Sequence, residues 1–163
     1  MISLGVDQST TKTGMCLIEF DKKFKWEFIK ATTVETSDYG NMKVWMLAMI
    51  INPAVVCAEW GYVGKNIQSA FQTIRTSGWC EAVTNEFWRE AKFFTASAAE
   101  WRNLIWYQGA GFMNRADAKK FSIDFLLKST YLSKVKPEKP DDHQGDALGL
   151  ALYGMHKYLE ATL

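Results

Sequence analysis

Four side chains that can bind a metal ion or move a proton lie where the sequence predicts two strand ends and a helix start. Asp7 follows an alternating apolar run and Glu59 ends a short continuous one, and both runs are typical of strands. His143 and Asp146 are three residues apart at the start of an apolar helical pattern, so they share one helix face. A carboxylate that emerges from a core is costly unless it is paired or metal-bound. The set therefore indicates a divalent-metal site.

The elements that must position these side chains alternate between strands and helices. Strand patterns cover residues 2–8, 14–20, 24–34, 55–59 and 92–96. Helical patterns cover residues 39–51, 66–90, 98–106 and 115–127, and a last helix follows the capping pair Asp141 and Asp142. This order predicts an α/β fold in which helices flank both faces of a five-stranded mixed β-sheet. At 163 residues, we expect a single domain, 1–163, with a sizeable core.

Composition and cysteine usage exclude several classes of protein. Hydrophobic residues make up 48% of the chain, and 19 basic residues balance 18 acidic ones, which argues against disorder. Cys16, Cys57 and Cys80 stand apart in apolar surroundings without a CxxC pair, so we expect reduced, buried thiols rather than a zinc site or disulfides. Asp7 comes too early for a signal peptide, and no apolar stretch is long enough to span a membrane. We expect a soluble cytoplasmic protein.

Beyond these single residues, the chain carries three segments that together resemble the core motifs of RuvC-type Holliday junction resolvases: GVDQSTTKTG (5–14), AEWGYVGKN (58–66) and DHQGDALGLAL (142–152). Their order and spacing match, over nearly the whole chain. The resemblance implies a ribonuclease H-like fold of the integrase superfamily, a homodimer, and an endonuclease that makes paired nicks in four-way DNA junctions. It implies two Mg²⁺ ions per site, with Mn²⁺ able to substitute. Neither a membrane nor a nucleotide cofactor is expected as a partner.

The resemblance assigns catalytic and metal-binding roles to the same four residues. The acidic positions of the family carry over to Asp7, Glu59 and Asp146, with His143 at a fourth position that some members fill with aspartate. Asp7 is expected to bridge two ions, while Glu59 and Asp146 each bind one of them. His143 is expected near the attacking water or the second ion. Asp142 is an alternative fourth residue, although the spacing in the family favours His143.

DNA contacts are expected mainly from the segment 115–139, which holds seven basic and three acidic residues. Such an excess suits phosphate binding, although a solvated helix face is the alternative. The resemblance adds further basic positions and an aromatic side chain that would stack on unpaired bases at the junction centre, although that side chain could equally be packed in the core. The residues expected to contact DNA are Tyr62, Lys65, Arg102, Arg115, Lys119 and Lys120.

Three other functions fit parts of the sequence. The segment 5–14 also resembles the first phosphate loop of actin-like and sugar-kinase ATPases, although those proteins need two lobes and this chain is short for them. A module that binds junctions without cutting is a second alternative, and a nuclease for flaps or forks is a third. The helical pattern 66–90 could form the dimer interface or an internal core. Bacterial and bacteriophage sources both fit, and we favour a bacteriophage, which would place the protein in the host cytoplasm.

Overall fold

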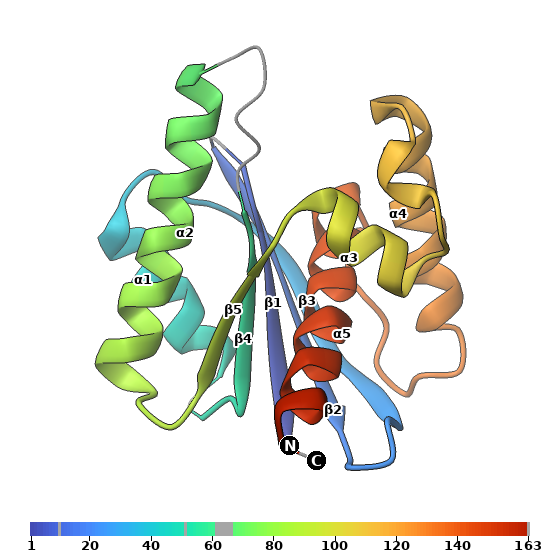
Figure 1. Ribbon diagram of the computed structural model, residues 1–163, viewed down its shortest axis with the longest axis horizontal. Coiled ribbons are helices and arrows are strands. Elements are labelled where there is room, and N and C mark those ends of the chain that lie inside the picture. The colour runs from blue at the N-terminus through green and yellow to red at the C-terminus, as the bar shows by residue number, and fades with distance from the viewer. Residues whose placement is uncertain (10, 51, 61–66, 163) are drawn as a thin grey trace.

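The computed structural model describes residues 1–9, 11–50, 52–60 and 67–162, and it contains five strands, five α-helices and a short 3₁₀ helix, η1, in those ranges (Figure 1). The strands are β1 Ile2–Gln8, β2 Lys12–Phe20, β3 Trp26–Glu35, β4 Val55–Glu59 and β5 Lys92–Ala96. The helices are α1 Tyr39–Met49, α2 Ile67–Phe87, α3 Ala98–Ile105, η1 Ala110–Phe112, α4 Arg115–Ser129 and α5 Asp142–Thr162.

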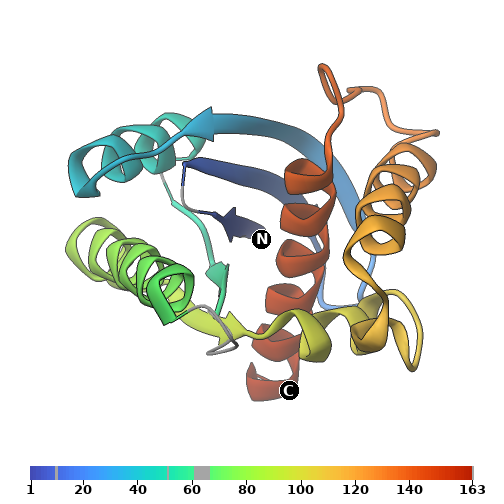
Figure 2. The ribbon, with the colours of Figure 1, turned by 90° about the horizontal axis from the view of Figure 1, so that it is seen from above.

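The strands form one mixed sheet in the order β3-β2-β1-β4-β5. β1, β2 and β3 are antiparallel neighbours, whereas β4 and β5 run parallel to β1. Parallel neighbours need a crossover connection, and α2 supplies it between β4 and β5. Helices α1 and α2 lie on one face of the sheet and α3, α4 and α5 on the other (Figure 2). The five-stranded mixed sheet with helices on both faces is therefore confirmed.

Helix α5 packs directly on the centre of the sheet, because two strand residues there have no side chain. A Cβ atom at Gly5 of β1 would overlap the carbonyl oxygen of Ala147, and one at Gly14 of β2 would overlap the carbonyl oxygen of His143. The helix backbone thus lies against the sheet, and Leu148 and Ala151 fill the core beneath it. This close approach brings the first turns of α5 to the end of β1, next to Asp7.

The other face has a second core, in which Met42 and Met46 of α1 pack with Cys80 and Val83 of α2. Helix α2 buries mainly small residues, whereas its Phe71 side chain is 67% exposed. Those buried residues are Thr76, Ser77, Cys80, Val83 and Thr84.

All three cysteines are free and buried, as expected. Within the described ranges, no helix has the length and apolar character needed to cross a membrane.

Candidate active site

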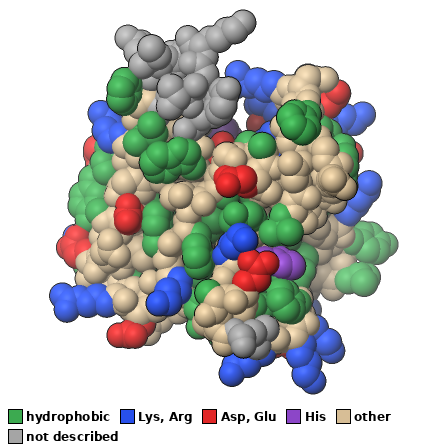
Figure 3. All heavy atoms as spheres, viewed as in Figure 1, with side chains coloured by type: hydrophobic (Ala, Val, Ile, Leu, Met, Phe, Trp, Pro, Cys, Tyr) green, Lys and Arg blue, Asp and Glu red, His purple; other side chains and the backbone are tan. Residues whose placement is uncertain are grey.

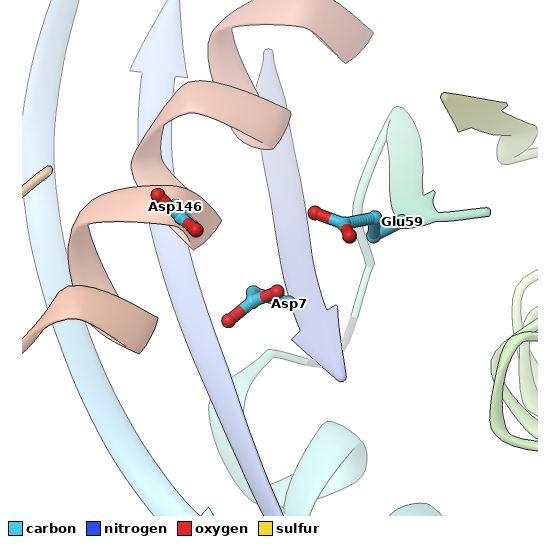
Figure 4. A group of neighbouring side chains, drawn as sticks. All are labelled: Asp7, Glu59 and Asp146. Carbon is cyan, nitrogen blue, oxygen red and sulfur yellow. The ribbon is translucent and has the colours of Figure 1, made fainter. Parts of the chain in front are cut away.

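Three carboxylates from distant parts of the chain meet at one end of the sheet (Figure 4). Asp7 lies near the end of β1, Glu59 is the last residue of β4, and Asp146 lies in the first turns of α5. Parallel strands end at the same edge of a sheet, so β1 and β4 deliver Asp7 and Glu59 side by side. One oxygen from each carboxylate lies within 4.8 Å of the others. The structure therefore brings together the three acidic residues predicted from the sequence.

Backbone and side-chain contacts fix the strand ends that carry these groups. The buried Gln8 side chain donates from Nε2 to the carbonyl oxygen of Glu59 at 2.6 Å, which ties the end of β1 to the end of β4. On the other side, Trp60 N donates to the carbonyl oxygen of Ala96 at 2.7 Å, so the pairing of β4 with β5 continues just beyond Glu59. The position of Glu59 is thus set by both neighbouring strands.

Each carboxylate in the cluster also contacts a polar group of a neighbouring side chain. His143 Nδ1 lies 2.7 Å from Asp7 Oδ2. Arg102 donates from Nη2 to Asp146 Oδ2 at 3.0 Å, and both of these side chains are about 15% exposed. The neutral indole N–H of Trp101 donates to an oxygen of Glu59 at 3.3 Å. These contacts only partly offset the repulsion among three clustered anions.

The electrostatics of the cluster favour uptake of protons or of a cation. Burial raises the pKa of Glu59 to about 8, and the charges of Asp7 and Asp146 add to the rise. Burial, together with Asp7, raises the pKa of Asp146 to about 7, although the Arg102 guanidinium acts in the opposite direction. Carboxyl groups with pKa values near neutrality indicate a site where burial and like charges disfavour the ionised form.

A divalent cation fits this arrangement by its chemistry. The three groups offer hard carboxylate oxygens, which are the ligands that Mg²⁺ and Mn²⁺ accept. Asp146 Oδ1 is buried and has no hydrogen-bond partner among the described residues. A buried acceptor left unpaired is costly, and a bound cation would satisfy it. Asp7, Glu59 and Asp146 are therefore the residues that could hold a metal ion.

His143 and Asp142 occupy different positions relative to the cluster. His143 contacts Asp7 but does not belong to the group of oxygens within 4.8 Å, and its hydrogen bond with Asp7 raises the pKa of its imidazole. Asp142 instead pairs with Lys119 of α4 at 2.7 Å. The helix cap comes from Asp141, whose Oδ1 accepts from Gln144 N at 2.9 Å, and not from Asp142. Of these two residues, His143 is the one whose side chain contacts the cluster.

The residues expected to contact DNA are dispersed. Arg102 lies inside the site, where Asp146 pairs with its guanidinium. Arg115, Lys119 and Lys120 are exposed on the first turns of α4. Figure 3 shows that Lys and Arg side chains project from the right-hand side of this view of the molecule. Tyr62 and Lys65 lie outside the described residues.

Sequence reasoning missed Trp101, which contacts Glu59 from α3. Its only local signal is the run Ser97–Glu100, a capping box in which Ser97 Oγ accepts from Glu100 N and Glu100 Oε2 accepts from Ser97 N. That run predicts where α3 begins. It does not predict which face of α3 turns toward β4.

Comparisons with known proteins place this fold. No protein-family model matches the chain, and no curated protein matches it. A structure of Thermus thermophilus RuvC in complex with a Holliday junction substrate is similar at TM-score 0.69 and 16% identity, covering 99% of this chain and 96% of that one. A complex of fowlpox virus resolvase with Holliday junction DNA is similar at TM-score 0.62 and 16% identity, covering 100% and 99%. The yeast mitochondrial Holliday junction resolvase is similar at TM-score 0.51 and 13% identity, covering 97% and 80%.

Proposed function

We propose that this protein is a Holliday junction resolvase, an endonuclease that cuts four-way DNA by metal-dependent hydrolysis of phosphodiester bonds. The observation that carries the proposal is the cluster of Asp7, Glu59 and Asp146, whose oxygens lie within 4.8 Å of one another. Its fold supports the same conclusion, because the structures similar over almost the whole chain include two resolvases in complex with Holliday junction DNA.

The chemistry of the site follows from its charges. Mg²⁺, when bound, neutralises charge at the phosphate and activates a water molecule for in-line attack. Asp7, Glu59 and Asp146 would hold the metal. Arg102 lies against Asp146 and keeps a positive charge beside the place where the scissile phosphate must come. A cation there favours the extra negative charge that develops on the phosphate in the transition state.

His143 has a position suited to proton movement. Its Nδ1 is engaged with Asp7, which fixes the ring and leaves Nε2 as the nitrogen free to exchange a proton with water. The Asp7 hydrogen bond raises the pKa of the imidazole, so the ring holds its proton to a higher pH than an isolated histidine. We infer that His143 orients Asp7 and exchanges a proton with the attacking water or the leaving oxygen.

The DNA would lie across the end of the sheet that carries the cluster. The exposed cations Arg115, Lys119 and Lys120 on α4 would contact phosphates on one side of the site. Tyr62 and Lys65 follow Glu59 in the chain and are proposed to contact the junction centre. Phosphate contacts of this kind position the DNA, and the branched shape selects it.

Paired cuts require two active sites related by a two-fold axis, so we propose that the protein acts as a homodimer. The exposed Phe71 on α2 supports this arrangement, because a large aromatic side chain that is 67% exposed is suited to an interface.

Cleavage of a panel of synthetic DNAs tests the proposal. Four-way, flap, fork and linear substrates of equal length should be incubated with Mg²⁺, with Mn²⁺ and with a chelator. The proposal predicts cutting of the four-way substrate with either metal, and none with the chelator. Preferential cutting of flaps or forks would instead assign the site to another branched-DNA nuclease. Tight binding without any cutting would assign a junction-binding module.

A further inference from the structure

Two consecutive residues of α3 reach two different carboxylates of the cluster. Arg102 pairs with Asp146 at 3.0 Å, and Trp101 donates from Nε1 to Glu59 Oε2 at 3.3 Å. We propose that Trp101 is a positioning residue of the metal centre, whose indole N–H fixes the Glu59 carboxylate in the orientation that binds Mg²⁺. The inference rests on the metal centre of the proposed function, and it adds a residue that the acidic motifs do not contain.

The chemical difference between the two partners is what gives Trp101 its role. A guanidinium neutralises the carboxylate that it pairs with, so Asp146 shares its negative charge with Arg102. An indole is neutral, and therefore orients Glu59 without cancelling its charge. A carboxylate is planar and rigid, so holding one oxygen also fixes the other. The Trp101 contact thereby holds the Glu59 carboxyl group in place without adding a positive charge that would compete with a bound cation.

The position of the indole N–H is set by the core. Trp101 has no exposed surface, and a Cβ atom at Gly149 of α5 would overlap its six-membered ring. Trp106 contacts the same ring edge-to-face, with ring centroids 4.9 Å apart and an interplanar angle of 84°. The Arg102 guanidinium lies 5.1 Å from the centroids of both rings. The indole therefore cannot turn away from Glu59 without repacking α3 against α5.

The distance between Trp101 and Glu59 is set by the sheet. Glu59 and Ala96 are paired residues of β4 and β5, and α3 begins two residues after Ala96. The capping box of Ser97 and Glu100 fixes the first turn of the helix, with Glu100 Oε2 accepting from Ser97 N at 2.7 Å. A short, rigid connection thus joins Trp101 on α3 to β5, the strand that pairs with β4 beside Glu59.

This arrangement has a consequence for the choice of metal. Mg²⁺ requires near-octahedral geometry with short ligand distances, whereas Ca²⁺ tolerates variable geometry and longer distances. A Glu59 carboxylate that is free to rotate would therefore weaken Mg²⁺ binding more than Ca²⁺ binding. Loss of hydrogen-bonding partners behind a metal ligand typically costs about 10–100-fold in metal affinity.

The chain offers a matched control for the test. Trp106 packs against Trp101, and its Nε1 is buried without a hydrogen-bond partner among the described residues. Trp101→Phe and Trp106→Phe thus remove the same atoms from neighbouring rings, and only the first removes a bond to Glu59. Mg²⁺ and Ca²⁺ affinities should be measured by calorimetry for both variants and the wild-type protein, without DNA. We expect Trp101→Phe to weaken Mg²⁺ binding by about 10-fold and Ca²⁺ binding by less, and Trp106→Phe to change neither by more than about 2-fold.

Unchanged Mg²⁺ affinity in Trp101→Phe, or an equal loss for both metals in both variants, would overturn the inference. If Trp101→Phe does not fold, the wild-type protein supplies a second measurement. The indole N–H resonance of Trp101, assigned through its backbone, should move during a Mg²⁺ titration, and a resonance that stays in place would also overturn the inference. Neither readout involves DNA. A protein that binds Mg²⁺ in this Trp101-dependent way but cuts no junction would therefore refute the proposed function alone.

Discussion

Replacing Glu59 by glutamine should stabilise the metal-free protein while destroying its metal centre. Glutamine keeps the size of the side chain and an oxygen that can accept from Trp101, but it carries no charge. Glu59 lies within 4.8 Å of two other carboxylates, and the guanidinium of Arg102 offsets only part of their negative charge. Removing one of three crowded anions therefore relieves repulsion that persists in the metal-free protein.

The size of the effect follows from the geometry. Two unit charges 4.8 Å apart repel by about 3 kcal/mol at an effective dielectric constant of roughly 20. Glu59 faces two such neighbours, and Arg102 cancels part of the repulsion, so we expect a net stabilisation of about 1–3 kcal/mol in Glu59→Gln. In a domain of 163 residues, each kcal/mol raises Tm by about 2–4 °C.

The stabilisation should depend on pH, with a sign fixed by the raised pKa. The pKa of Glu59 rises from an ordinary value of 4.5 to about 8 in the folded protein. Between these values the folded protein holds a proton that the unfolded chain has lost, so the free energy of unfolding falls as pH increases through the window. Glu59→Gln lacks this group. Its advantage over the wild-type protein should be small near pH 5 and full above pH 8.

Thermal unfolding in a chelator, at about pH 5 and about pH 8.5, measures this difference. The matched control is Glu81→Gln, which removes a glutamate that is exposed on α2 and lies outside the cluster. It should follow the wild-type protein at both pH values. Added Mg²⁺ should stabilise the wild-type protein and leave Glu59→Gln unchanged. A lower Tm for Glu59→Gln than for the wild-type protein in chelator at the higher pH would refute the reasoning.

Three further outcomes are expected. In single-turnover assays, His143→Ala should sharply reduce the rate of junction cleavage, whereas His143→Asp should retain much of that rate. Asp142→Ala should lose only the ion pair with Lys119, worth at most about 1 kcal/mol of stability, and should cut normally. The reverse pattern would move the fourth site residue to Asp142. Arg102→Ala should destabilise the metal-free protein by about 1–3 kcal/mol in chemical denaturation, because Asp146 loses the partner of its ion pair, and saturating Mg²⁺ should restore part of that stability. Equal stability of the variant and the wild-type protein would show that this ion pair does not stabilise the fold. Phe71→Asp should shift sedimentation toward a monomer, and a wild-type protein that is monomeric both free and on a junction would contradict the proposed homodimer.

Local patterns were sufficient to predict the sheet and the three carboxylates. Alternating and continuous apolar runs identify strands, and the strands that carry Asp7 and Glu59 both end in a polar residue at the edge of the core. Strand and helix ends moved by a few residues. For example, the helix predicted to reach residue 51 ends at Met49, because the backbone of Ile50 is already extended.

Contacts between distant elements were not predictable in the same way. Arg102, expected from the resemblance to contact DNA, pairs with Asp146, and Trp101 was not identified at all. Both depend on how α3 docks between β5 and α5, which the local periodicity of an eight-residue helix does not determine. For the helical pattern on α2, periodicity left a dimer interface and an internal core equally open, and in the structure Thr76 and Ser77 are buried while Phe71 is exposed. The single domain 1–163 and the bacteriophage source stay predictions.

The most direct test of the central claim is a map of the nicks on a four-way junction whose strands are each labelled in turn. The wild-type protein with Mg²⁺ should give two nicks, at symmetrically related positions on opposite strands. Asp7→Asn and Asp146→Asn should bind the junction with wild-type affinity and give no nicks, because their amides keep the shape but lose the anionic charge that holds the metal. Near-normal nicking by either variant at saturating Mg²⁺, or cutting of linear duplex as fast as of the junction by the wild-type protein, would contradict the account.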